Sequence, residues 1–152
     1  MKSVKILLLI IGVVFITNIS YAQTSVFSTP EGFKWGMTRN QVLKLNYGKP
    51  TKSDNEMIYY LNRETMNSLL YKFSNNKLIS ITKKYGFETE DELVNDFEKY
   101  KKQLIALYGS NFKEIAFEQF VWVYKNTRIM LFNSYDNDKM KVFITYEKIT
   151  NK

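Results

Sequence analysis

The sequence contains no cysteine and no histidine among its 152 residues. Without these residue types, Ser-His-Asp and Cys-His nucleophilic catalysis are excluded, together with nearly every zinc or copper site. The chain also lacks disulfide bonds and a cysteine that could carry a lipid. Its six glycines are isolated and form no phosphate-binding loop. We therefore expect a protein that is not an enzyme, with no cofactor and no catalytic, cofactor-binding or metal-binding residue.

A hydrolase with two carboxylates would need neither cysteine nor histidine. The acidic residues, however, gather where a helix is expected to begin, at Glu88, Glu90, Asp91 and Glu92. Negative charge is favourable there because the helix dipole is positive at its N-terminus. We therefore interpret these acids as structural.

The chain also lacks a long uninterrupted apolar segment. Its longest apolar run, residues 6–19, is broken by Gly12, Thr17 and Asn18 and is shorter than the ~20 residues that span a bilayer. Two lysines precede this run and Ser20-Tyr21-Ala22 follows it, which is the pattern of a secretory signal peptide. We predict a signal peptide over residues 1–22, cleavage after Ala22, and a periplasmic or secreted protein. An uncleaved membrane anchor is the alternative.

Long runs of basic residues are absent as well. Removal of the signal peptide leaves 20 of the 22 basic residues beside 15 acidic ones, a net charge of +5. Because Lys and Arg are scattered and the protein is expected to be exported, nucleic acid is not an expected partner. Peripheral contact with anionic lipid headgroups stays open.

Two segments each show a helix followed by strands. Thr38 and Gln41 form a capping box, and Gly48 and Pro50 end this first short helix. Period-two patterns then predict strands at residues 57–61, 68–73 and 78–85, with a tight turn at 74–77.

The second segment begins with another capping box, formed by Thr89 and Glu92. Apolar residues then recur at helical spacing up to Tyr108, and Gly109 ends the predicted helix. Strands are predicted at residues 119–125, 128–134 and 139–149. We therefore predict an α+β fold in which two tandem α-β-β-β units, about 33–85 and 88–150, form an antiparallel sheet with helices on one face. Both units belong to a single mature domain, 23–152.

A series of motifs occurs in one order within residues 33–85: Gly36-Met37-Thr38, Gln41-Val42, Gly48-Lys49-Pro50, Ile58-Tyr59-Tyr60, and residues 70–75 leading to Leu78-Ile79. With these motifs, residues 33–85 resemble the BamE (SmpA/OmlA) family of outer-membrane assembly proteins. The doubled layout is similar to the beta-lactamase inhibitory protein, in which two such units form a curved sheet that grips a partner protein. The resemblance implies an exported, non-enzymatic module for protein binding or envelope assembly, whose partner is another envelope protein. A protein that binds a lipid or a small apolar ligand between helix and sheet is the alternative.

One strand combines three alternating aromatic residues, Phe120, Trp122 and Tyr124, which must share one face of the sheet. Val121 and Val123 occupy the other face. If the valines face the helices, the aromatic row is an exposed interaction surface for the partner. If the aromatic residues face the helices, they belong to the core.

Overall fold

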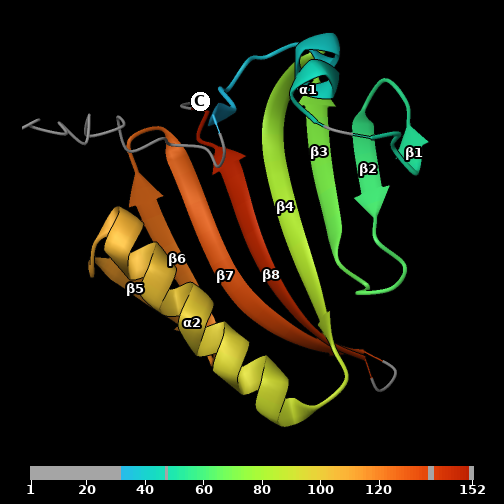
Figure 1. Cartoon of the computed structure of the whole chain (residues 1–152). Helices are drawn as coiled ribbons and strands as arrows, with labels where there is room; N and C mark the ends of the chain where they lie inside the picture. Colours follow the sequence, from blue (N-terminus) through green and yellow to red (C-terminus); the bar gives the residue numbers. More distant parts are fainter. Residues whose placement is uncertain (1–31, 47, 137–138, 151–152) are drawn as a thin grey trace, which may run out of the picture.

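The computed structural model describes residues 32–46, 48–136 and 139–150, and it is dominated by one antiparallel sheet of eight strands (Figure 1). The elements in chain order are α1 Arg39–Leu45, β1 Lys52–Ser53, β2 Met57–Leu61, β3 Ser68–Ser74, β4 Lys77–Phe87, α2 Glu90–Tyr108, β5 Phe112–Ala116, β6 Gln119–Tyr124, β7 Thr127–Asp136 and β8 Lys139–Lys148. The strand order across the sheet is β1-β2-β3-β4-β8-β7-β6-β5. The last strand of the chain therefore lies at the centre, where it pairs with β4.

The fold class expected from the sequence is wrong. The chain does not form two α-β-β-β units under a layer of helices, because strands predominate, each helix is followed by four strands, and β4 pairs with β8 to make the sheet continuous. The expected pattern lacked β1 and β5, the two strands at the sheet edges. Strand β1 has only two residues, and β5 is exposed along most of its length, so neither has the alternating pattern that identifies a strand.

The long helix α2 begins and ends as its sequence predicts. Thr89 and Glu92 form the capping box, and the N–H of Gly109 donates to the carbonyl oxygen of Ile105 at 2.8 Å with a left-handed φ of 87° at the glycine. Leu93, Phe97 and Leu104 are its buried residues. These lie on one stripe that packs on the sheet.

Helix α1 also has its predicted capping box, formed by Thr38 and Gln41, but it is only seven residues long. A helix of this length is not stable alone. It is held by Val42, which is fully buried, and by Thr38, which forms a bridge with Lys77 at the start of β4. Asn46, its C-cap residue, accepts a hydrogen bond from the hydroxyl of Tyr71 at 2.8 Å. The helix is thereby fixed to one end of the sheet.

The register places one row of buried side chains across the centre of the sheet. Tyr71 is opposite Ile81, Ile81 opposite Tyr146, Tyr146 opposite Ile129, and Ile129 opposite Trp122. All five side chains are buried. Since directly opposite residues share a face, this row defines the core face of the sheet.

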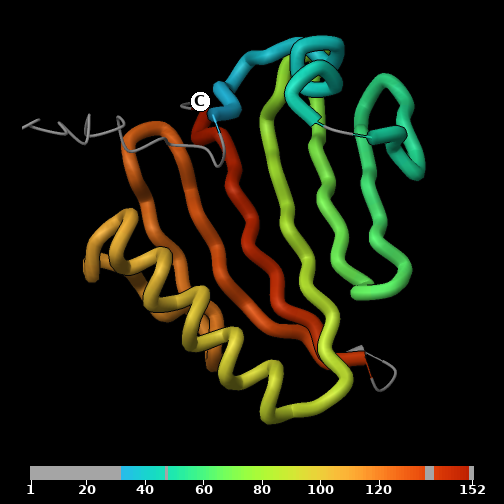
Figure 2. The backbone as a smooth tube through the Cα atoms, viewed as in Figure 1, coloured from blue at the N-terminus to red at the C-terminus, as the bar shows by residue number. Residues whose placement is uncertain are grey.

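The helices cover only part of that core face. Figure 2 shows α2 crossing the half of the sheet that contains β5 to β8, and the helix contacts β7, β8 and the end of β4, while α1 lies at the opposite corner, over the ends of β3 and β4. The lower parts of β2 and β3 have no helix in front. No helix among the described residues is long and apolar enough to span a membrane.

Candidate functional site

The structure places the predicted aromatic row in the core. Phe120 and Trp122 are only 5% and 1% exposed, and Tyr124 is half-buried. The ring of Phe120 lies 6.0 Å from that of Phe97 on α2, and the indole N–H of Trp122 donates to the carbonyl oxygen of Gly109 at 3.0 Å. The hypothesis that these three residues form an exposed interaction surface is therefore wrong, because their face is the one that α2 covers.

The opposite face of the sheet carries the alternate residues. Val121 is opposite Met130, Met130 opposite Thr145, and Thr145 opposite Thr82. No helix of the described residues packs on this side, so we call it the open face. Val123, which is 65% exposed, also belongs to it.

Two aromatic rings stand near the middle of the open face. Phe132 and Phe143 are opposite each other on β7 and β8, and their rings stack with centroids 4.9 Å apart and an interplanar angle of 9°. Both side chains are half-buried although no described element covers them. Alternation along each strand predicts which face each phenylalanine shares with its neighbours. Phe132 and Phe143 lie in different strands, however, so their contact follows only from the register of β7 with β8.

The strands of the open face are rich in basic residues. They include Lys72, Lys84, Lys113, Arg128 and Lys141, assigned to this face by their register partners. The acidic residue Glu147 shares the face, and its carboxylate lies 3.7 Å from the guanidinium of Arg128. Basic side chains thus outnumber acidic ones among the described strand residues of the open face.

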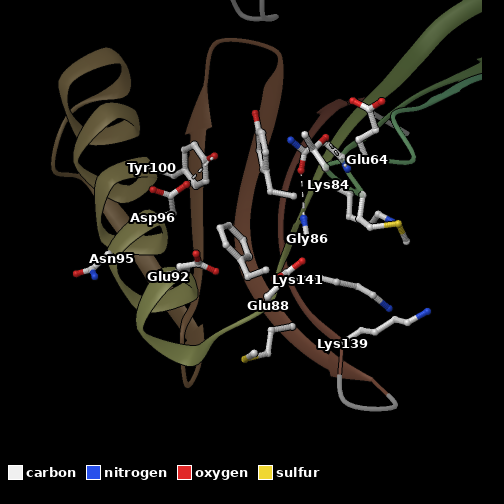
Figure 3. A pocket seen from close by; sticks show the side chains of 16 residues that line it. Glu64, Lys84, Gly86, Glu88, Glu92, Asn95, Asp96, Tyr100, Lys139 and Lys141 are labelled. Atoms are coloured by element: carbon white, nitrogen blue, oxygen red, sulfur yellow. Dashed lines mark hydrogen bonds between the residues drawn. The ribbon is translucent and has the colours of Figure 1, made fainter.

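A cleft of about 860 Å³ lies on the other side of the molecule, between α2 and the loop that joins β2 to β3 (Figure 3). Tyr85 and Phe87 at the end of β4 and Met140 at the start of β8 supply much of its apolar lining. Helix α2 contributes Glu92, Asn95, Asp96 and Tyr100, and the loop contributes residues 64–67. None of these residues was identified as a site from the sequence.

The cleft exists because β3 and β4 have unequal lengths. Pairing between them begins at Ser68 and Lys84, but β4 continues to Phe87. Beyond this point, the side chain of Asn67 supplies the acceptor that a neighbouring strand would otherwise supply. Its Oδ1 accepts the backbone N–H of Gly86 at 3.2 Å. A Cβ atom on Gly86 would lie 2.9 Å from Cβ of Met66, so only glycine permits the loop to approach this closely.

A stacked tyrosine pair joins the sheet to the helix within the cleft. The rings of Tyr85 and Tyr100 have centroids 4.6 Å apart and an interplanar angle of 24°. The hydroxyl of Tyr100 donates to Asp96 Oδ2 at 3.4 Å. Burial, followed by the proximity of Tyr85 and Asp96, raises the pKa of Tyr100 far above its usual value, so this hydroxyl stays protonated at neutral pH.

A smaller hollow of about 280 Å³ adjoins the cleft and shares Tyr85 with it. Tyr60 and Leu69 line this hollow from β2 and β3. The hydroxyl oxygen of Tyr60 is buried and has no hydrogen-bond partner among the described residues, and burial raises its pKa. Together the two hollows form a groove along the part of the core face that the helices leave uncovered.

Charges of both signs line the cleft. Glu88, Glu92 and Asp96 lie on the α2 side, and Glu64 lies in the loop. The basic residues at its border, Lys84, Lys139 and Lys141, occupy strand positions of the open face, and Figure 3 shows Lys139 and Lys141 extending away from Tyr100. Among the described residues, no group of three or more His, Cys, Asp and Glu side chains could hold a metal ion.

No protein-family model matches the chain, and no curated protein matches it either. A solved structure with similarity to it is that of a DUF4309 family protein (YjgB) from Bacillus subtilis subsp. subtilis str. 168. The two sequences are 13% identical, the match covers 73% of this chain and 78% of the other, and the TM-score is 0.42. Similarity at this level carries no argument about function.

Proposed function

We propose that the chain is an exported, non-enzymatic protein that binds another envelope protein through the open face of its sheet. The observation that carries the proposal is the Phe132 and Phe143 stack, which stands on a face that no described element covers. Apolar side chains on an uncovered surface are characteristic of protein contact sites.

The open face is large enough for a stable complex. At ~3.4 Å per residue and ~4.8 Å between strands, the observed strand lengths correspond to roughly 900 Å². A standard interface buries about 800 Å² on each partner. The basic side chains around the aromatic stack favour a partner with an acidic contact surface. The signal-peptide pattern and the resemblance of residues 33–85 to the BamE family support an envelope location for that contact.

Binding of a lipid or small apolar ligand is the second candidate, because the cleft between α2 and the sheet offers a cavity of suitable size. The charged residues that line the cleft make it unsuitable for a purely apolar ligand. Four acidic and three basic residues border the cleft, and a lipid chain offers no polar group to these charges. We therefore favour the protein-binding function.

Affinity capture from envelope extracts tests the proposal, with the mature protein as bait and the captured protein identified. Val123→Glu and Lys72→Glu both alter exposed positions on the open face and should reduce capture without affecting folding. Phe117→Ser is the matched control, because Phe117 is 84% exposed but lies in the turn between β5 and β6. Equal capture by wild type and the two open-face variants would contradict the proposal.

A further inference from the structure

The cleft between α2 and the β2–β3 loop is a second candidate site, on the opposite side of the sheet from the open face. Its volume of about 860 Å³ lies within the range of pockets that hold small ligands or short peptide segments. It combines an apolar floor with charged walls. We propose that it binds a peptide segment through a lysine or arginine side chain, which lies against α2.

Two carboxylates on α2 make the helix side of the cleft acidic. Glu92 and Asp96 are four residues apart and therefore neighbours on one helix face. Glu92 accepts the backbone N–H of Thr89 at 3.3 Å, and Asp96 accepts the hydroxyl of Tyr100 at 3.4 Å. A carboxylate can accept about four hydrogen bonds, so both side chains keep acceptor capacity for a bound cation.

The tyrosine pair beside these carboxylates provides a second contact for a cation. Aromatic faces attract ammonium and guanidinium groups that lie within about 6 Å of the ring centre. The chain already shows this combination at the rim, where Nζ of Lys99 lies 3.5 Å from Asp96 Oδ1 and 5.8 Å from the Tyr100 ring centroid. A ligand cation that enters from the cleft side would find the same two groups together with Glu92 and Glu88.

The other lining residues favour a peptide over a free cation. Phe87, Met66 and Met140 offer apolar contacts to the aliphatic part of a long side chain and to neighbouring residues. Because Glu92 and Asp96 lie on α2, the basic side chain of the peptide lies against this helix.

The test is a titration of the isotope-labelled mature protein, followed by amide NMR shifts. The probe is acetyl-Ala-Arg-Ala-amide, and the controls replace arginine by citrulline, which is a neutral isostere, or by glutamate. We expect the arginine peptide alone to shift the amide signals of Tyr85, Asp96 and Tyr100, and this binding to weaken as salt rises from 50 to 300 mM. Equal shifts with citrulline, or shifts confined to other regions, would overturn the proposal.

Substitutions that remove charge but keep hydrogen bonding sharpen the test. Glu92→Gln retains the capping box and Asp96→Asn retains an acceptor for Tyr100, so both variants should fold. Together they should weaken binding of the arginine peptide about tenfold. Asp91→Asn is the control, because this exposed residue of the same helix does not line the cleft.

Unchanged affinity in the double variant would refute the role of the carboxylates. If that variant fails to fold, the citrulline comparison and the salt dependence in the wild type still decide the question. Val123→Glu on the open face should bind the arginine peptide as wild type does. The cleft and the proposed protein-binding face are therefore tested separately, and either can fail without the other.

Discussion

Replacement of Trp122 by alanine is the most direct test of how the sheet faces are assigned. The side chain is 1% exposed, its ring lies 5.0 Å from that of Phe112, and its indole N–H donates to Gly109. Truncation of a buried tryptophan to alanine typically costs about 3–5 kcal/mol. The lost hydrogen bond adds little, because Gly109 is exposed and water can replace the donor. We expect a loss near 4 kcal/mol, a large part of the ~5–15 kcal/mol of a typical domain.

Urea unfolding followed by far-ultraviolet circular dichroism measures this loss. Val123→Ala is the matched control, because it changes the neighbouring residue on the opposite face and should alter stability by no more than ~0.5 kcal/mol. Trp35 is the other tryptophan of the chain, so in a Trp35→Phe background the emission comes from Trp122 alone and should be blue-shifted and resistant to acrylamide. A loss below ~1 kcal/mol for Trp122→Ala, or a readily quenched red-shifted emission, would refute the assignment of this face to the core.

Two further predictions concern half-buried tyrosines. Tyr60→Phe should raise the free energy of unfolding by about 1 kcal/mol, because it removes a buried hydroxyl that has no partner among the described residues; a loss of stability in urea melts would contradict this. Burial raises the folded-state pKa of Tyr100, so its contribution to stability is complete below the unfolded value of 10.0 and is lost as the pH rises from there through the folded pKa. Urea melts should show stability falling above about pH 10, less steeply in Tyr100→Phe, and equal slopes would exclude this cause.

Helix boundaries could be predicted because their signals are local. Thr38 with Gln41 and Thr89 with Glu92 form both capping boxes, and Gly109 adopts the left-handed conformation that ends α2. The turn between β3 and β4 is equally local, since Asn75 and Asn76 both have positive φ. A few neighbouring residues determine each of these features, whatever the rest of the chain does.

The edge strands could not be predicted because their pairing depends on distant or exposed residues. Strand β5 buries only Phe112 in part, against the rings of Phe120 and Trp122, while its remaining residues are exposed. Strand β1 consists of two residues that pair with Tyr59 and Ile58 on β2. Without these two strands, each half of the chain was predicted one strand short, which produced the wrong fold class.

The orientation of the aromatic row could not be predicted from the sequence for a different reason. Alternation correctly groups Phe120 with Trp122 and Val121 with Val123, because successive side chains point to opposite faces. It does not determine which group faces the helix. The face that the aromatic residues occupy depends on where α2 packs in the tertiary structure. Helix α2 packs on the face of Phe120, where its Phe97 contacts that ring. The same uncertainty hid the Phe132 and Phe143 stack, which requires the register of β7 with β8.

The cleft is the least predictable feature, because no single segment encodes it. Its lining comes from the β2–β3 loop, the end of β4, the first half of α2 and the start of β8. Strand β4 extends beyond the start of its pairing with β3, and Asn67 and Gly86 then hold the loop at the free edge. Strand length and pairing therefore create the cavity, and α2 adds charge because its hydrophobic stripe turns Glu92 and Asp96 toward the uncovered part of the sheet. The acidic residues of this helix are visible in the sequence, but the cleft that they line forms only when the sheet is assembled.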